Sequence, residues 1–133
     1  MTSRLTEIVV DCHDPHRLAA FWSAALGYTS IADTNSDVEI AAYEPTAEGI
    51  RAAAGAPTLI FIPVPEGKDR KNRLHLDISP IDDSRDGEVD RLIALGASRV
   101  DIGQGERSWV VLADPEGNEF CVMRTLAPAP DAG

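Results

Sequence analysis

The order strand–helix–strand–strand–strand occurs twice along the chain, and this repeat narrows the possible folds more than any other feature. When the two halves are aligned, Glu7 falls on His75 and Gly27 falls on Gly96. The halves agree in their pattern of apolar and turn-forming residues more than in residue identity. Such a repeat predicts a fold built from two copies of one supersecondary unit.

The expected fold class is α+β, with two βαβββ modules that pair into a cup-shaped, partly open sheet. The modules span 4–65 and 74–125, which together make a single domain over 1–125, and 126–133 is expected to be a flexible tail. A chain of 133 residues with 44% apolar residues can bury the core that one such domain needs.

The first half begins with alternating β-branched residues, which predict a strand over 4–12. A helix is expected next, because Asp14 is a good N-cap, Pro15 a good first residue and Gly27 a good stop. Trp22 falls at helical spacing within it and is expected in the core. The other elements expected in this half are strands over 28–33, 37–44 and 58–64 and a loop over 45–57.

The second half repeats this order. A helix is expected within 82–97, where Asp82 aligns with Asp14, Ile93 belongs to the apolar set and Gly96 ends the helix. The sequence "DPEGNE" predicts a hairpin turn, because Pro suits its second position and Gly tolerates positive φ. The strands expected in this half span 74–80, 98–102, 107–113 and 119–125.

Side chains alternate between the two faces of a strand, so one face of each module is left for the cup. Leu74, Leu76 and Ile78 would pack against a helix in the second half, as Ile8 and Val10 would in the first. The residues expected to line the cup are Glu7, Val9, Asp11, His75, Asp77, Ser79, Trp109, Glu119, Cys121 and Met123. A lining that is half polar and half apolar is typical of small-ligand sites.

The stretches "LTEIVVDCHDPHRLAAFWSAALGY", "RLHLDISPID" and "VVLADPEGNEFCVM" resemble the vicinal oxygen chelate superfamily. That group includes glyoxalase I, bleomycin-resistance proteins and extradiol dioxygenases, and the resemblance covers nearly the whole chain. It implies a cup that holds one divalent ion, with ligands from the first and last strands of each module. The matching positions here fall on Glu7, His75, Cys121 and, in the fourth strand, Phe61 or Ile62.

The chain departs from this pattern at two of these positions. Cys121 stands where the family has a glutamate, and neither Phe61 nor Ile62 can bind a metal. Glu7 and His75 alone make two ligands, whereas catalytic sites usually have three. This count favours a cup without a metal, in which Glu7 and His75 hydrogen-bond each other. A site for Zn, Ni, Mn or Fe, with Cys121 or Glu119 as the third ligand, stays as the alternative.

Three functions remain open at this point. The resemblance implies an enzyme, a lyase or isomerase or a dioxygenase relative, with Glu7 and His75 as its catalytic residues. The second possible function is that of a metal-free protein that binds and sequesters an antibiotic-like compound. The third is metal-free acid–base catalysis by His75 with Glu7 or Asp77. The residues expected to contact the ligand in each case are Asp77, Trp109, Glu119, Cys121 and Met123.

Charge and composition restrict the partners. The net charge of −10 disfavours nucleic acid and anionic membranes, and no apolar run is long enough for a transmembrane helix. With no signal peptide and two cysteines that suit reduced thiols, we expect a cytoplasmic protein, and the family resemblance implies a homodimer. The basic residues within 68–73 form either a solvated linker or a rim that attracts anionic ligands.

Overall fold

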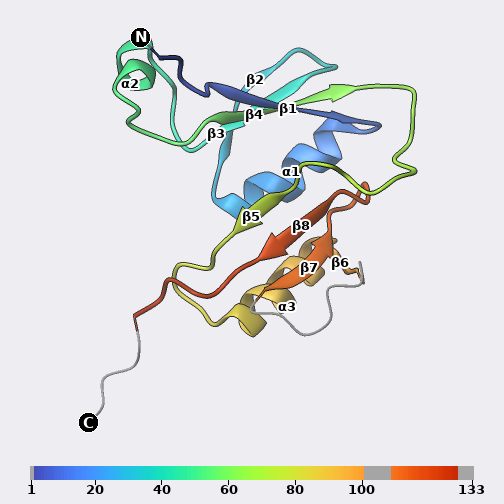
Figure 1. Cartoon of the computed structure of the whole chain (residues 1–133). Coiled ribbons are helices and arrows are strands. Elements are labelled where there is room, and N and C mark those ends of the chain that lie inside the picture. The colour runs from blue at the N-terminus through green and yellow to red at the C-terminus, as the bar shows by residue number, and fades with distance from the viewer. Residues whose placement is uncertain (1, 101–108, 129–133) are drawn as a thin grey trace. The chain divides into compact units, whose positions relative to one another are not determined.

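The computed structural model describes residues 2–100 and 109–128, which fall into two compact units, Met1–Lys68 and Asp69–Gly133 (Figure 1). The first unit contains β1 (Glu7–Cys12), α1 (Pro15–Leu26), β2 (Thr29–Asp33), β3 (Val38–Ala41), α2 (Ala47–Arg51) and β4 (Thr58–Pro63). The second contains β5 (Leu76–Ile78), α3 (Arg85–Leu95), β6 (Ser98–Arg99), β7 (Val110–Ala113) and β8 (Glu119–Val122).

Both units have the same sheet topology. The strand orders are β1-β4-β3-β2 and β5-β8-β7-β6, and in each sheet the first strand pairs in parallel with the last. The sheets are open and mixed, and each unit carries one long helix. The predicted α+β fold with an internal βαβββ repeat is therefore confirmed, while the cup shared by the two sheets stays a prediction.

The core of the first unit follows the alternation of its strands. Along β1, Ile8 and Val10 are half-buried and Cys12 is buried, whereas Glu7, Val9 and Asp11 are exposed. Helix α1 lies against β3 and β4, and its buried residues include Leu18, Phe21 and Trp22. The Asp14 carboxylate accepts a hydrogen bond from the Arg17 N–H, and Gly27 ends the helix in the left-handed conformation, as predicted.

The prediction of a loop over 45–57 is wrong in part, because this segment contains the short helix α2. The Thr46 hydroxyl accepts a hydrogen bond from the Gly49 N–H at 3.0 Å, which caps the helix. Good helix formers follow the cap, but the Ala, Gly and Pro around them concealed this signal in the sequence. The observed strands β1 and β3 are also shorter than the strands predicted over 4–12 and 37–44.

The predicted start of the second helix is corrected. The cap is Ser84, whose hydroxyl accepts from the Gly87 N–H at 3.0 Å, and Asp82 lies outside the helix. Val89 and Leu92 are buried and α3 lies against β8, whereas Ile93, expected in the apolar set, is 37% exposed. Gly96 ends the helix as predicted, with a φ of 125°.

The strand expected over 74–80 is reduced to the three residues of β5. The ladder with β8 begins where Leu76 pairs with Phe120, so the preceding residues have no strand partner on that side. Leu74 is accordingly 89% exposed, which corrects its predicted place in the core. The turn before β8 is as predicted: the Asp114 carboxylate accepts hydrogen bonds from the N–H groups of Glu116 and Asn118.

Parts of two predictions fall outside the described residues. The strands expected over 98–102 and 107–113 extend into 101–108, and β6 and β7 are their described parts. The tail expected from 126 onward is described only to residue 128, and the Leu126 N–H donates to the Pro80 carbonyl at 2.7 Å. Within 2–100 and 109–128, none of the helices has the length and apolarity needed to span a membrane.

Candidate functional site

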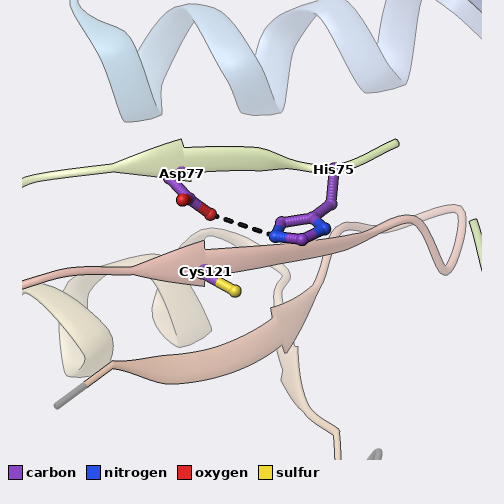
Figure 2. A group of neighbouring side chains, drawn as sticks. All are labelled: His75, Asp77 and Cys121. Carbon is purple, nitrogen blue, oxygen red and sulfur yellow. Dashed lines mark ion pairs between the residues drawn. The ribbon is translucent and has the colours of Figure 1, made fainter. Parts of the chain in front are cut away.

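Three side chains of different chemistry meet on the second sheet: His75, Asp77 and Cys121, together called the His75 cluster (Figure 2). Each offers one ligand atom, and these nitrogen, oxygen and sulfur atoms all lie within 4.8 Å of one another. The His75 Nε2 is 3.2 Å from the Asp77 Oδ1. The imidazole and the carboxylate are 41% and 52% exposed, whereas Cys121 is buried.

The strand register explains why these side chains meet. Asp77 of β5 pairs with Cys121 of β8, and Cys121 pairs with Val111 of β7, so the three share one face of the sheet. Phe120 and Val122 flank Cys121 in β8 and so point to the opposite face of the sheet, where they are fully buried in the core. His75 precedes Asp77 by two residues, and its ring extends toward the Asp77 carboxylate, as Figure 2 shows.

The charges around Cys121 favour its neutral thiol. Burial is the largest cause of its raised pKa, followed by the negative charge of Asp77 and a hydrogen bond between the two side chains. The positive charge of Lys71 acts in the opposite direction. The thiol is therefore protonated at neutral pH and donates to Asp77, which makes Asp77 the shared acceptor of the cluster.

The His75 cluster fits a divalent ion. Catalytic zinc sites use three protein ligands of imidazole, thiolate and carboxylate type and keep one position open. The cluster supplies one ligand of each type, with half-exposed His75 and Asp77 leaving access for a fourth ligand. Two of the three residues predicted as metal ligands, His75 and Cys121, are thus together, and Asp77 joins them.

Glu7, the third predicted ligand, has its own partners within the first unit. Its pKa is raised, chiefly by partial loss of hydration and then by the charge of Glu39 and a hydrogen bond with it, while a hydrogen bond from Thr58 acts against the shift. Glu39 was missed in the sequence. The alternation of β3 could have indicated Glu39 as a neighbour of this face. Glu39 pairs with Ile60, which pairs with Val9, so the three residues form one row across the sheet.

The remaining predicted ligand contacts lie at the margins of the second sheet. The Glu119 Oε2 accepts a hydrogen bond from the Asn72 N–H at 3.1 Å, which ties this carboxylate to the segment before β5. Met123 follows β8 and Trp109 precedes β7, and both are half-buried. Phe61, considered for the fourth strand, is fully buried, and its register with Val10 directs it to the α1 side of its sheet.

The two other histidines are exposed and bonded within the first unit. The His16 Nε2 lies 3.0 Å from the Asp33 carboxylate, and the His13 Nε2 lies 3.0 Å from the Pro65 carbonyl. His16 and Asp33 therefore form a second histidine–aspartate pair, and this one has no thiol partner among the described contacts. The pair lies at the start of α1, on the surface of the first unit.

The first unit also holds a cavity of about 380 Å³ beside α2. Its lining is mainly apolar, with Leu5, Ile50 and Pro57 among its residues. Polar groups on its wall bond to the protein: the Tyr43 hydroxyl donates to the Ala54 carbonyl at 2.7 Å. No cluster of three metal-binding side chains other than the His75 cluster occurs in the described parts of the chain.

Comparison with known proteins agrees with the observed fold. A family model described as "Glyoxalase-like domain" matches residues 7–123. A glyoxalase/bleomycin resistance protein/dioxygenase family enzyme from Burkholderia phytofirmans PsJN is 17% identical, with a TM-score of 0.61 over 90% of this chain and 97% of that chain. No curated protein matches the sequence.

Two fosfomycin resistance proteins, both FosX, also share the fold. The one from Mesorhizobium loti is 13% identical, with a TM-score of 0.66 over 92% of each chain. The one from Listeria monocytogenes, a variant solved with Mn(II) and 1S,2S-dihydroxypropylphosphonic acid, is 15% identical, with a TM-score of 0.63 over 94% of this chain and 92% of that chain. At such identities the likeness is one of fold, and function must be argued from the site.

Proposed function

The chain belongs to the glyoxalase-like domain family, and on that premise we propose that it binds a small oxygen-bearing molecule at the His75 cluster. We propose further that it acts on this molecule as a lyase or isomerase that moves a proton. The observation behind the proposal is the 3.2 Å contact between the His75 imidazole and the Asp77 carboxylate, with a buried thiol beside it.

The paired imidazole and carboxylate suit general acid–base chemistry. The Asp77 Oδ1 lies 3.2 Å from Nε2, and its negative charge favours a proton on that nitrogen, which leaves Nδ1 as the basic nitrogen. Figure 2 shows Nδ1 on the side of the ring that points away from Asp77. From there it can take a proton from a carbon next to a carbonyl or from a hydroxyl, while the Asp77 charge stabilises the imidazolium that forms.

The other two members of the site shape and polarise it. Cys121 and Val111 are buried on the same face and give the ligand an apolar floor. In place of proton transfer by His75, an ion held by His75, Asp77 and Cys121 would supply Lewis-acid polarisation of substrate oxygens. The mostly exposed segment before β5 carries Lys71, whose positive charge near Cys121 favours a ligand with a negative or strongly polar group.

The setting of this activity is part of the proposal. Both cysteines are free and buried, one in each unit, which agrees with a reducing compartment such as the cytoplasm. We also propose a homodimer, because the described sheets leave edge strands that a second copy can cover. The net charge of −10 argues against nucleic acid as a partner.

The test is a ligand and exchange screen by NMR on the full chain. Small α-hydroxycarbonyl compounds are mixed with the protein in D₂O, and binding and solvent exchange of the carbon-bound proton are measured separately. His75→Ala should lower the exchange rate by about 100-fold or more, because a positioned base contributes about 10²- to 10⁴-fold. The matched variant His16→Ala, which also loses a histidine paired with an aspartate, should leave exchange unchanged.

Two results would contradict the proposal in different ways. Exchange that persists in His75→Ala would remove His75 as the base. Binding without exchange, weakened less than tenfold by His75→Ala, would favour the metal-free binding protein considered from the sequence.

A further inference from the structure

We propose that the His75 cluster is a self-contained site for a thiophilic divalent cation, Zn²⁺ or Co²⁺, with Asp77 as a ligand alongside His75 and Cys121. This inference goes beyond the proposed function and does not rest on it, because an ion on Nε2 leaves the ring proton on Nδ1 and His75 is then a base only in the ion-free protein. The site lies wholly within the second unit, so it needs no residue of the first. It differs from the ligand set expected by resemblance, because Asp77 takes the place of Glu7.

The geometry supports three ligands to one ion. The three candidate atoms lie within 4.8 Å of one another, and two of them are already 3.2 Å apart. Zinc binds sulfur at about 2.3 Å and imidazole nitrogen or carboxylate oxygen at about 2.0–2.2 Å, so ligands of one ion lie about 3–4 Å apart. His75 and Asp77 are half-exposed, so their side chains have room to rotate toward these distances while the strand ladder stays as it is.

The donor set determines the class of ion. A thiolate and an imidazole suit zinc and cobalt, whereas Mn²⁺, Mg²⁺ and Ca²⁺ prefer sites made of oxygen ligands. On binding, the S–H bond of Cys121 breaks, a metal–sulfur bond forms and the proton leaves to the buffer. The ring proton of neutral His75 is then carried on Nδ1, so that Nε2 coordinates the ion in place of its 3.2 Å contact with Asp77.

The other carboxylates that the sequence suggested as ligands have partners of their own, which leaves Asp77 as the oxygen ligand. The Glu119 carboxylate accepts a hydrogen bond from the Asn72 backbone. Glu7 hydrogen-bonds with Glu39 and Thr58 on its own sheet. Asp77 is the carboxylate whose register places it directly beside Cys121.

The experiment is a cobalt titration of the reduced, chelator-treated full chain, followed by displacement with zinc. We expect one ion per chain and a thiolate-to-cobalt charge-transfer band, which zinc abolishes and Mn²⁺ does not. Cys121→Ser should lose the band, whereas Cys12→Ser, the matched buried cysteine, should keep it. His75→Ala and Asp77→Asn should each weaken zinc binding by more than about tenfold, since even supporting groups contribute about 10- to 100-fold.

The controls separate this site from the others. Glu7→Gln and His16→Ala should leave cobalt and zinc affinity unchanged, and circular dichroism should show that each variant is folded. A missing band, a band that follows Cys12, or a loss in Glu7→Gln equal to that in His75→Ala would each overturn the inference. Small-molecule binding measured in chelator is independent of these results, so the proposed function can fail or survive separately.

Discussion

Two histidine–aspartate pairs in this chain differ in what surrounds them. The His16 Nε2 lies 3.0 Å from both oxygens of Asp33, which joins α1 to the end of β2. The same carboxylate accepts a hydrogen bond from the Asn35 N–H at 2.9 Å in the turn that follows. In the His75 cluster the carboxylate lies between an imidazole and a thiol. The first pair is a structural tether, and the second keeps reactive groups together.

The first pair predicts an acid-dependent contribution to stability. The pKa of Asp33 is lowered from its usual 3.8, first by the Asn35 N–H and then by the hydrogen bond to His16. A carboxyl with a lower pKa in the folded state stabilises the fold above 3.8, and this contribution is lost as the pH falls through the folded value. Asp33→Asn should therefore lower the free energy of unfolding at pH 6, by an amount that shrinks toward pH 2.

Urea unfolding of both proteins across this range measures the difference. Asp37→Asn, a change two residues beyond Asn35 in the same loop, is the control for a general effect of removing charge from an acidic chain. A difference between wild type and Asp33→Asn that stays constant from pH 6 to pH 2 would contradict the linkage.

At the residue scale the sequence indicated which side chains belong to the candidate site, but not which of them contact one another. Alternation placed His75, Asp77 and Cys121 among the residues that line one face, and the family resemblance singled out His75 and Cys121. The contact between Asp77 and Cys121 depends on the register of β5 against β8, which pairs residues far apart in the chain. A one-residue change of register would have moved Cys121 to the other face, and the sequence alone does not fix it.

At the scale of elements, helix ends were the most dependable signals and strand ends the least. Gly27 and Gly96 both end helices, because each supplies the positive φ that a helix terminus requires. Strand lengths depend on how far a partner extends, so 74 and 75 were wrongly included in a strand that has no ladder there. The start of α3 was also placed too early, since several residues before it can cap a helix.

The cap assignment predicts a difference between two neighbouring substitutions. Ser84→Ala should destabilise the protein by about 1 kcal/mol, because the Gly87 N–H loses the hydroxyl that accepts its hydrogen bond. Asp82→Ala should change stability by less than about 0.5 kcal/mol, as for most surface substitutions. Thermal or urea unfolding of the two variants compares them directly, and the reverse order would show that Asp82 caps the helix after all.

The segment after α2 makes a second prediction at this scale. A methyl group added at Gly55 would coincide with the Tyr43 hydroxyl, which donates to the Ala54 carbonyl. Gly55→Ala should therefore destabilise the wild type but be neutral or slightly stabilising in a Tyr43→Ala background, where the conformational effect of alanine remains. The expected coupling energy is about 1 kcal/mol, and unfolding of the four proteins of this double-mutant cycle measures it. Additive effects would contradict the contact.

At the scale of the whole molecule, the repeat and the α+β class could be predicted from the sequence. Both units have the same order of strands and helix, and in both the apolar residues alternate along the strands that form the core. Phe61 and Phe120 occupy the centres of the two cores, on strands that alternation identified. Composition and charge limited the partners, since an excess of ten negative charges opposes binding to phosphate backbones. Neither property selects a substrate, because the fold supports many activities.

The predicted homodimer belongs to this scale. Sedimentation equilibrium at micromolar concentration should give about twice the monomer mass, because paired edge strands or helix faces would bury apolar side chains such as Leu5 and Leu74, which are 71% and 89% exposed. Leu74→Lys should then shift the equilibrium toward the monomer, and Ala42→Lys, at another exposed position, serves as the control. The monomer mass at high concentration would remove this prediction.

The parallel pairing of first and last strands also governs the order in which the chain can fold during synthesis. Glu7 pairs with Thr58 and Leu76 pairs with Phe120, so each sheet closes only after a long loop has been made. Such non-local pairing has high contact order and slows folding. The first sheet becomes complete once residue 63 leaves the ribosome, while β5 waits for β8 with its edge open. Interruptions in translation between them would leave one folded unit and one nascent strand exposed to aggregation or chaperones.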